Sequence, residues 1–262
     1  MVEKLSQVEI ADIALSRGIN TIPDFFSSDL AHKVSEDYGQ ASLITSHNTC
    51  AHIDDLGDVV AGVEALLKDE GVFVMEVGYF VDVFQNKWFD TIYHEHLRSL
   101  SVSSIVNLFS QYPLSVVKVQ QTSRYGGNIR VLVRKGDHDS IDGSVEEFIQ
   151  REKDLGFFRQ ETYNKFRQNT ISTKMGLLEL LIDLKKKGKS VAGYSLPARA
   201  ITLINYVGID HDLLPYVVEQ KSSLKLNKFV PGTRIPVISN ECLEMNKPDY
   251  LLVFAWHLKD EI

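Results

Sequence analysis

The sequence predicts an α/β protein with two domains. Short apolar runs alternate with amphipathic segments from residue 5 to residue 77, and a second alternation begins at residue 189. A short, fully apolar run is typical of a strand buried in a parallel sheet, whereas apolar residues three and four apart indicate a helix. A length of 262 residues is enough for two domains of ordinary size.

The first domain is predicted to span residues 1–137. Apolar residues recur at helical spacing from Leu5 to Ala14, and Gly18 is a suitable end for that helix. From this alternation we expect a parallel sheet covered on both faces, with an antiparallel hairpin at its edge. The other predicted elements are helices at 28–38 and 58–68, a short strand at 20–23, buried strands at 42–45 and 72–77, and hairpin strands at 115–120 and 129–134.

The second domain is predicted to span residues 138–262, after the polar stretch 137–144. Residues 144–187 are expected to be largely helical, and the run Lys185–Lys187 suits the C-terminal end of a helix. The remaining predicted elements are strands at 189–194, 216–218 and 249–255, a helix at 200–207, and a turn at 231–236 that leads into an edge strand.

Composition and charge are those of an ordinary globular protein, with 44% apolar residues, 24% charged residues and a net charge of −7. The basic residues form no stripe, so we expect no nucleic-acid partner. The chain has no apolar run of membrane-spanning length and no signal-peptide core, so we expect no membrane association. Two distant cysteines, Cys50 and Cys242, are typical of free thiols. We therefore predict a cytoplasmic protein that binds no metal.

The run Tyr93-His94-Glu95-His96 is the first candidate site. A histidine can accept a proton near neutral pH, a carboxylate can orient an imidazole, and a tyrosine hydroxyl can donate to a developing oxyanion. On a strand, the two histidines would lie on one face and Tyr93 and Glu95 on the opposite face. A polar surface turn and a metal site are the alternatives, although the histidine spacing is not that of a helical zinc motif.

Two further segments lie where ligands bind in α/β sheets, just beyond a predicted strand. Ser46–Asp55 contains Asn48 and His52, and helix capping is the alternative function of its polar residues. Gly193–Ala200 joins a strand to a helix through small residues, so its backbone N–H groups, together with Arg199, can hold a phosphate. A plain turn between strand and helix is the alternative there.

A series of segments, in order along nearly the whole chain, resembles the sugar C-methyltransferases. Members of this family use S-adenosylmethionine and act on deoxysugar nucleotides. The most specific segment is FDTIYHEHL, followed by GYSLPARAITLINYVGI and PGTRIPV. The other matching segments are GINTIPDFF, HNTCAHIDDL, LLKDEGVFVMEVGYF, YGGNIRVLVRK and FAWHLKDEI.

The resemblance implies a partial Rossmann-like class I methyltransferase domain followed by a second, Rossmann-like domain that binds the sugar nucleotide. It implies a thymidine-diphosphate-linked 4-keto-6-deoxysugar as the substrate. A base removes the C3 proton, which the adjacent ketone acidifies, and the resulting enolate attacks the methyl group of S-adenosylmethionine.

The resemblance also assigns roles to individual residues. His96 is implied to be the base, and Tyr93, Glu95 and His52 complete the catalytic group. The residues implied to bind the cofactor are Asn48, Phe25 and Phe26. The residues implied to bind the substrate are Tyr79, Gly193, Tyr194, Ser195, Pro197, Arg199, Glu219 and Gln220.

The chain departs from the family pattern in several places. It has no cysteine-rich zinc module and no glycine-rich cofactor loop before Leu5, and Ser195, Leu196 and Arg199 stand where Gly, Ala and Lys are usual. We therefore expect a chain truncated at both ends, with no zinc, weak or no binding of S-adenosylmethionine by itself, and a separately encoded N-terminal half as a partner. The alternative functions are a non-catalytic sugar-nucleotide-binding module and an epimerase-like enzyme that abstracts a proton without a methyl donor.

Overall fold

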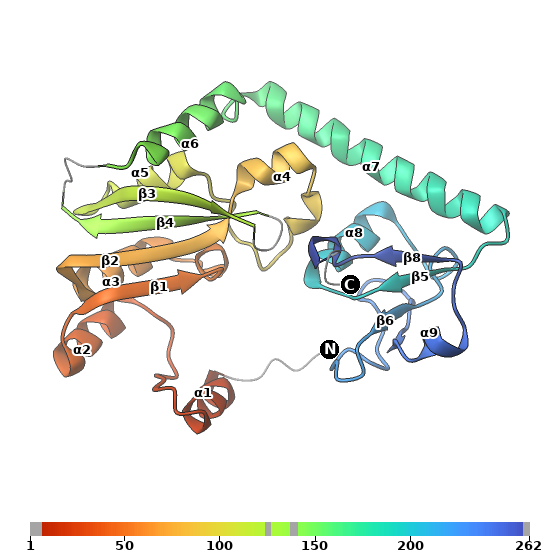
Figure 1. The fold of residues 1–262 in the computed structure, drawn as a ribbon, viewed down its shortest axis with the longest axis horizontal. Helices are drawn as coiled ribbons and strands as arrows, with labels where there is room; N and C mark the ends of the chain where they lie inside the picture. Colours follow the sequence, from red (N-terminus) through yellow and green to blue (C-terminus); the bar gives the residue numbers. More distant parts are fainter. Residues whose placement is uncertain (1–6, 124–126, 137–140, 259–262) are drawn as a thin grey trace. The chain divides into compact units, whose positions relative to one another are not determined.

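The computed structural model describes residues 7–123, 127–136 and 141–258, which form helices and strands in an α/β arrangement. The chain divides into two compact units, and the described residues of each contain a four-stranded sheet (Figure 1). The first unit comprises residues 1–79, 98–122 and 128–151, and the second comprises residues 80–97, 123–127 and 152–262. The predicted domain boundary between residues 137 and 138 lies outside the described residues.

The first unit contains a mixed sheet with the strand order β1-β2-β4-β3. Strand β1 pairs with β2 in parallel, whereas β2 with β4 and β4 with β3 are antiparallel pairs. The strands are β1 (Ala41–His47), β2 (Leu67–Gly78), β3 (Leu114–Thr122) and β4 (Asn128–Lys135). The helices are α1 (Gln7–Ser16), α2 (Ser28–Tyr38), η1 (Cys50–His52), α3 (Leu56–Leu66), α5 (Val102–Phe109) and α6 (Gly143–Asp154), whose last turn enters the second unit.

Several predictions for the first unit need correction. The sheet itself agrees with the prediction: β1 and β2 form the parallel part, and the predicted antiparallel hairpin supplies β3 and β4 at its edge. Strand β1 is an edge strand of the described sheet rather than a buried one, and Leu43 is 60% exposed. The strand predicted at 20–23 is absent, because the chain makes a local turn there in which the Asp24 N–H donates to the Ile22 carbonyl at 2.9 Å.

From Phe73 to Val77, every second side chain of β2 is apolar and contributes to the core of the first unit. Phe73, Met75 and Val77 point to one side and are buried, and the Phe73 ring lies 6.1 Å from the Phe109 ring of α5. Burying a side chain of this size contributes about 1.5–3 kcal/mol. The core therefore holds β2 in place, and with it the residues at the carboxyl ends of β1 and β2.

The second unit contains an all-parallel sheet with the order β7-β6-β5-β8. The helical region predicted at 144–187 is confirmed, and Gly156, with φ 61°, lies in the break between α6 and α7. The helices of this unit are α4 (Phe80–Asn86), η2 (Phe89–Thr91), α7 (Gln160–Lys186), α8 (Ala198–Val207), α9 (Cys242–Met245) and η4 (Trp256–Leu258). The strands are β5 (Val191–Tyr194), β6 (Val217–Glu219), β7 (Val237–Ser239) and β8 (Tyr250–Val253).

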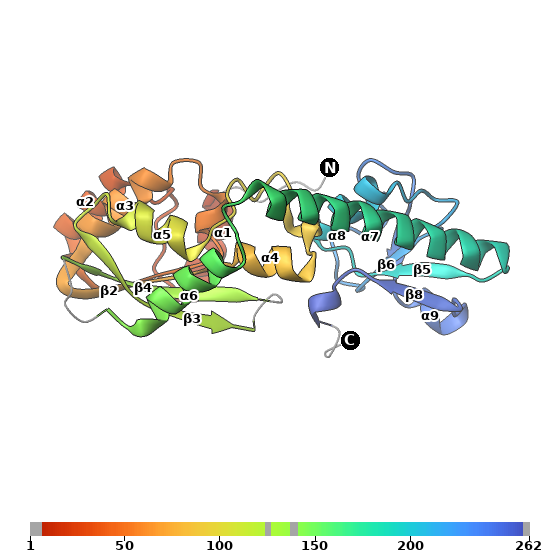
Figure 2. The same cartoon turned by 90° about the horizontal axis from the view of Figure 1, so that it is seen from above.

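The strand order of the second sheet creates a switch point beside β5. The chain proceeds from β5 to β6 and β7 on one side, and then returns to β8 on the other side of β5. Figure 2 shows α7 and α8 along the same side of this sheet, where Leu181 of α7 and Ile204 of α8 join its apolar core. In open parallel sheets, ligands bind at the carboxyl ends of the strands at such a point.

Gly193 is required at this switch point because two side chains approach it closely. A Cβ built on Gly193 would lie 2.7 Å from Val217 Cγ2 and 2.8 Å from Phe254 Cε2. We therefore expect Gly193→Ala to destabilise the second unit by about 1–3 kcal/mol, as measured by urea denaturation.

The same substitution at Gly176 is the matched control. Gly176 lies inside α7, and a Cβ there would meet nothing within 4 Å. Gly176→Ala should stabilise the chain by about 0.5–1 kcal/mol, because alanine has the higher helix propensity. A Gly193→Ala variant as stable as the parent chain would contradict the close packing.

Candidate functional site

The segment Tyr93–His96 forms a turn, which is the alternative that the sequence left open, and not a strand with both histidines on one face. The His96 N–H donates to the Tyr93 carbonyl at 2.9 Å, which closes a four-residue turn. The turn brings together the side chains of the first and fourth residues rather than those of the two histidines. His94 is exposed, whereas Tyr93 and His96 are half-buried.

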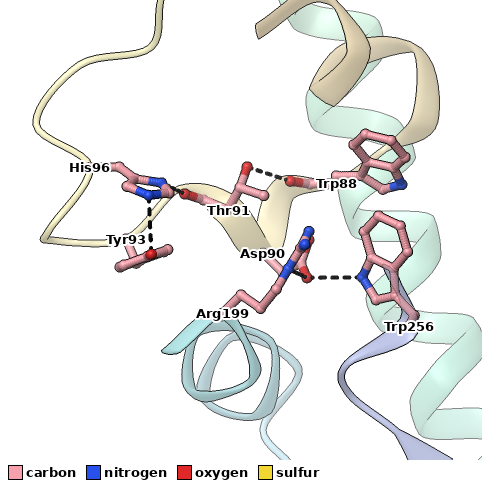
Figure 3. Close-up of polar contacts among 7 residues, drawn as sticks. All are labelled: Trp88, Asp90, Thr91, Tyr93, His96, Arg199 and Trp256. Carbon is pink, nitrogen blue, oxygen red and sulfur yellow. Dashed lines mark hydrogen bonds and ion pairs between the residues drawn. The ribbon is translucent and has the colours of Figure 1, made fainter. Parts of the chain in front are cut away.

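The hydrogen bonds of His96 determine its neutral tautomer. Its Nδ1 lies 2.7 Å from the Thr91 carbonyl oxygen, which can only accept, so Nδ1 carries the proton (Figure 3). In neutral His96 the other ring nitrogen, Nε2, is therefore the acceptor, and the Tyr93 hydroxyl lies 3.1 Å from it. The geometry leaves Nε2 as the basic atom of this imidazole.

Tyr93 donates to that basic atom as a neutral phenol. Burial raises the pKa of the Tyr93 hydroxyl, the negative charge of Glu95 raises it further, and the Arg199 cation opposes the rise. A hydroxyl with a raised pKa keeps its proton at neutral pH. Tyr93 can therefore donate a hydrogen bond to His96 or to an oxyanion.

A buried ion pair lies just before this turn. Asp90 in η2 accepts hydrogen bonds from two nitrogens of Arg199, which is in the first turn of α8. The Trp256 indole N–H also donates to Asp90 Oδ2, at 3.3 Å (Figure 3). Sequence reasoning assigned no role to Asp90, Thr91 or Trp256. An aspartate within the apolar and aromatic run of FDTIY is the signal that could have indicated a buried carboxylate.

The turn after β5 is held by a second charged pair. Ser195 has a positive φ of 64°, and the Leu196 N–H donates to Glu219 Oε1 at 2.7 Å. Lys225 Nζ donates to the Leu196 carbonyl at 2.6 Å and lies 3.3 Å from Glu219 Oε1. The structure thus places Glu219 beside the strand–helix turn. Glu219 is the last residue of β6, which pairs in parallel with β5, so the two strand ends lie side by side.

The other residues implied to bind the substrate differ in exposure. Gly193 is buried, Tyr194, Ser195 and Pro197 are half-buried, and Gln220 is exposed. Tyr79 is fully buried in the first unit, where its ring lies 5.4 Å from the Phe148 ring and Arg151 lies over it. The Tyr79 side chain therefore has no exposed surface for a substrate in this structure.

The residues implied to bind the cofactor lie in the first unit. Asn48 follows β1 with a positive φ of 52°, its N–H donates to the Glu76 carbonyl, and its Oδ1 accepts from Asn128 at 2.9 Å. The Phe25 ring is 76% exposed, whereas Phe26 packs near Gly62 of α3.

The structure brings Tyr93, Glu95 and His96 into one unit with Arg199 and the β5 turn. His52 lies in η1 of the first unit and is exposed, so its grouping with the other catalytic residues stays a prediction. The described residues contain no helix long and apolar enough to cross a bilayer and no group of three His, Cys, Asp or Glu side chains placed to hold a metal ion.

Comparison with known proteins gives one close match to part of a longer protein. A C-methyltransferase from Streptomyces niveus, NovU, is 34% identical over 255 residues. The alignment covers 97% of this chain and 60% of NovU, so the chain spans about three fifths of the length of this curated relative.

Solved structures give more distant likenesses. A SAM-dependent methyltransferase from Anabaena variabilis matches at a TM-score of 0.33 with 11% identity, over 43% of this chain and 56% of that one. A 1,6-didemethyltoxoflavin-N1-methyltransferase from Burkholderia thailandensis, crystallised with S-adenosylhomocysteine, matches at a TM-score of 0.34 with 18% identity, over 49% of this chain and 57% of that one.

The family is shown by a model of its C-terminal region. Residues 123–262, more than half of the chain, match the model described as the C-methyltransferase C-terminal domain. This match includes the β5 turn and Arg199, and the NovU alignment covers most of the remaining residues. The chain belongs to the C-methyltransferase family.

Proposed function

We propose that this chain takes part in transferring a methyl group from S-adenosylmethionine to C3 of a thymidine-diphosphate-linked 4-keto-6-deoxysugar. The observation that carries the proposal is the hydrogen bond from His96 Nδ1 to the Thr91 carbonyl. It leaves Nε2 as an acceptor that can remove a proton from carbon. A ketone next to C3 makes that proton acidic enough for an imidazole base.

Tyr93 has two functions in this proposal. Without substrate its hydroxyl lies 3.1 Å from His96 Nε2. When the sugar is bound, the hydroxyl moves to the ketone oxygen and donates to the enolate as negative charge develops there. Glu95, whose charge acts on Tyr93, stabilises the imidazolium that forms when His96 accepts the proton. The family resemblance implies His52 as a further catalytic residue, which either orients the base or stabilises the enolate oxygen.

The substrate is proposed to bind at the switch point of the second sheet. The turn Ser195–Pro197 follows β5 there, Glu219 is the last residue of the neighbouring strand β6, and Gln220 follows it. Backbone N–H groups at the start of α8 suit the diphosphate, as they do in other open sheets. Gly193 and Tyr194 support this turn from within β5. Arg199 belongs to the same predicted group, and its ion pair with Asp90 gives it a second role.

S-adenosylmethionine supplies an electrophilic methyl group when it is bound. The exposed Phe25 ring can stack on a planar base. Phe26, the next residue, can add an apolar contact, and Asn48 can add a polar one. These residues fit one part of the cofactor, and the sequence before them contains no glycine-rich loop for its carboxylate end.

We therefore propose that a further polypeptide segment completes the cofactor site. NovU extends beyond the aligned residues, and β1 is an edge strand of the described sheet with Leu43 largely exposed. An exposed strand edge presents unpaired backbone groups that another strand can join. A segment equivalent to the unaligned part of NovU, in the same chain or encoded separately, fits this edge.

The proposal is tested by following C3 of the 4-keto-6-deoxysugar nucleotide in D₂O, with and without S-adenosylmethionine carrying a labelled methyl group. We expect the chain to catalyse exchange of the C3 proton for deuterium. Methyl transfer is expected only when the N-terminal half of NovU is added, and it should appear in the product mass.

Three results would separate the alternatives. Exchange without methyl transfer under every condition would indicate an epimerase-like enzyme and overturn the proposal. Sugar-nucleotide binding without exchange would indicate a non-catalytic module. Micromolar binding of S-adenosylmethionine to the chain alone, measured by calorimetry, would contradict the need for a further segment.

A further inference from the structure

The Asp90–Arg199 pair is built more tightly than an ordinary surface ion pair. Arg199 Nε lies 2.6 Å from Asp90 Oδ2, and Arg199 Nη2 lies 3.0 Å from Asp90 Oδ1. Asp90 is 6% exposed and Arg199 is 8% exposed. Two parallel hydrogen bonds fix both the position and the plane of the carboxylate. The pair therefore determines where η2 lies against α8.

Trp256 contacts both the carboxylate of Asp90 and the guanidinium of Arg199, and Trp88 packs against Trp256. The Trp256 indole N–H donates to Asp90 Oδ2, and the Arg199 guanidinium lies 4.4 Å from the centre of the Trp256 ring. The Trp88 ring lies 4.7 Å from the Trp256 ring (Figure 3). Three donor groups thus converge on one carboxylate, and the Trp256 ring lies against the guanidinium of this buried pair.

Thr91 connects this ion pair to His96, because it is bonded to Asp90 along the chain and to His96 Nδ1 by a hydrogen bond. Thr91 follows Asp90 directly, and its carbonyl oxygen accepts a hydrogen bond from His96 Nδ1–H at 2.7 Å. The Thr91 hydroxyl donates to the Trp88 carbonyl at 2.8 Å, which ties the same residue to η2. A carboxylate held in one place therefore holds the carbonyl that orients the imidazole.

We propose that Arg199 and Asp90 are positioning residues for His96: their ion pair aims the Thr91 carbonyl, which keeps Nδ1 protonated and Nε2 available as the base. This inference rests on the proposed function of His96. It gives the Arg199 guanidinium a role that does not require contact with the substrate. Second-layer partners of this kind set the tautomer and orientation of functional histidines in other proteins.

The charge of Arg199 also reaches the turn itself. Among the charges that act on the Tyr93 hydroxyl, Arg199 lowers the pKa and Glu95 raises it. The cation therefore lies within electrostatic range of the hydroxyl that contacts His96 Nε2. This observation supports the geometric argument, because a side chain that positions the turn must lie close to it.

The test compares Asp90→Asn, Arg199→Met and the double variant Asp90→Asn/Arg199→Met with the parent chain. One readout is the ¹⁵N shifts of the His96 imidazole, and the other is the C3 exchange rate. Each single variant should slow exchange about 100-fold, because a displacement of about 1 Å in a reacting group costs that much. KM of Asp90→Asn should stay within about threefold, because Asp90 is not among the residues proposed to bind the substrate. Arg199→Met removes a residue of that group, so its positioning role is judged from the imidazole shifts.

The imidazole shifts separate positioning from general stability. In the parent chain they should report the Nδ1-protonated tautomer, and in the three variants a mixture of tautomers. Arg199→Lys, which keeps one charged donor, should restore the tautomer and the exchange rate in part. Lys189→Met is the matched control, because it removes an exposed ion pair with Asp249 and should change neither readout.

The double variant makes the inference falsifiable even if a single variant folds poorly. Removing both charges avoids an uncompensated buried charge, so its stability should recover towards that of the parent. Recovery of the exchange rate together with stability would show a merely structural role and overturn the inference. Unchanged His96 shifts in all variants would overturn it as well. A parent chain without exchange would refute the proposed function, while the shifts would still test the positioning.

Discussion

Replacing His96 with glutamine is expected to slow C3 proton exchange by about 10³-fold without unfolding the chain. General base catalysis of this kind typically contributes between about 10² and 10⁴ in rate. The half-buried imidazole makes hydrogen bonds to Thr91 and Tyr93, so its loss removes the base at modest cost to packing. The measurement is the decay of the C3 proton signal in D₂O, with circular dichroism to verify folding.

His94→Gln is the matched control for this prediction. His94 lies in the same turn but is exposed, so the same substitution there should leave the exchange rate within about twofold. Equal losses at both positions would indicate that the turn, rather than one imidazole, is required. Full exchange by His96→Gln would remove the base assignment altogether.

Replacing Arg130 with methionine is expected to destabilise the first unit by about 3 kcal/mol. Glu76 is fully buried on β2, and its Oε2 lies 2.7 Å from Arg130 Nη2 and 3.2 Å from Arg130 Nε on the neighbouring strand β4. Losing the guanidinium leaves a carboxylate in the core without its main cation, and breaking such a pair costs about 3–5 kcal/mol when both partners are buried. Arg130 is partly exposed, which places the value at the lower end.

Amide hydrogen exchange in β2 and β4 measures this loss separately from the stability of the second unit. The double variant Glu76→Gln/Arg130→Met should recover most of the stability, because no buried charge remains. Lys118→Met, which breaks an exposed pair with Asp142 in the same unit, should cost less than about 1 kcal/mol. Similar losses of unfolding free energy in Arg130→Met and Lys118→Met would contradict the claim that buried Glu76 needs the Arg130 cation.

Much of the secondary structure could be predicted from the sequence because its signals are local. The helix predicted at 28–38 is α2, and the hairpin predicted around residue 125 is β3 and β4. Helical spacing and alternation depend on neighbouring residues, so they can be read without knowledge of the fold. The predictions that failed concern Ser42–Thr45 and Asn20–Pro23, where the choice between buried strand, edge strand and irregular chain depends on distant partners.

The candidate site was located from the sequence, but its geometry was not. The residue types of Tyr93 and His96 indicated a base and a hydroxyl donor. A strand would have placed His94 and His96 together, whereas the turn pairs Tyr93 with His96, three residues apart. Turn formation here depends on the His96 bond to Thr91 and on the packing of η2, which no local pattern encodes.

The sequence by itself determined the α/β class, the family resemblance and the residue types that can remove a proton. Only the tertiary structure decided which nitrogen of neutral His96 is the acceptor and which residue Arg199 binds. Asp90 and Arg199 are separated by 109 residues along the chain, and each carries a charge that must find a partner once it is buried. Which partner it finds depends on how η2 packs against α8, because that contact is set by the whole fold of the second unit.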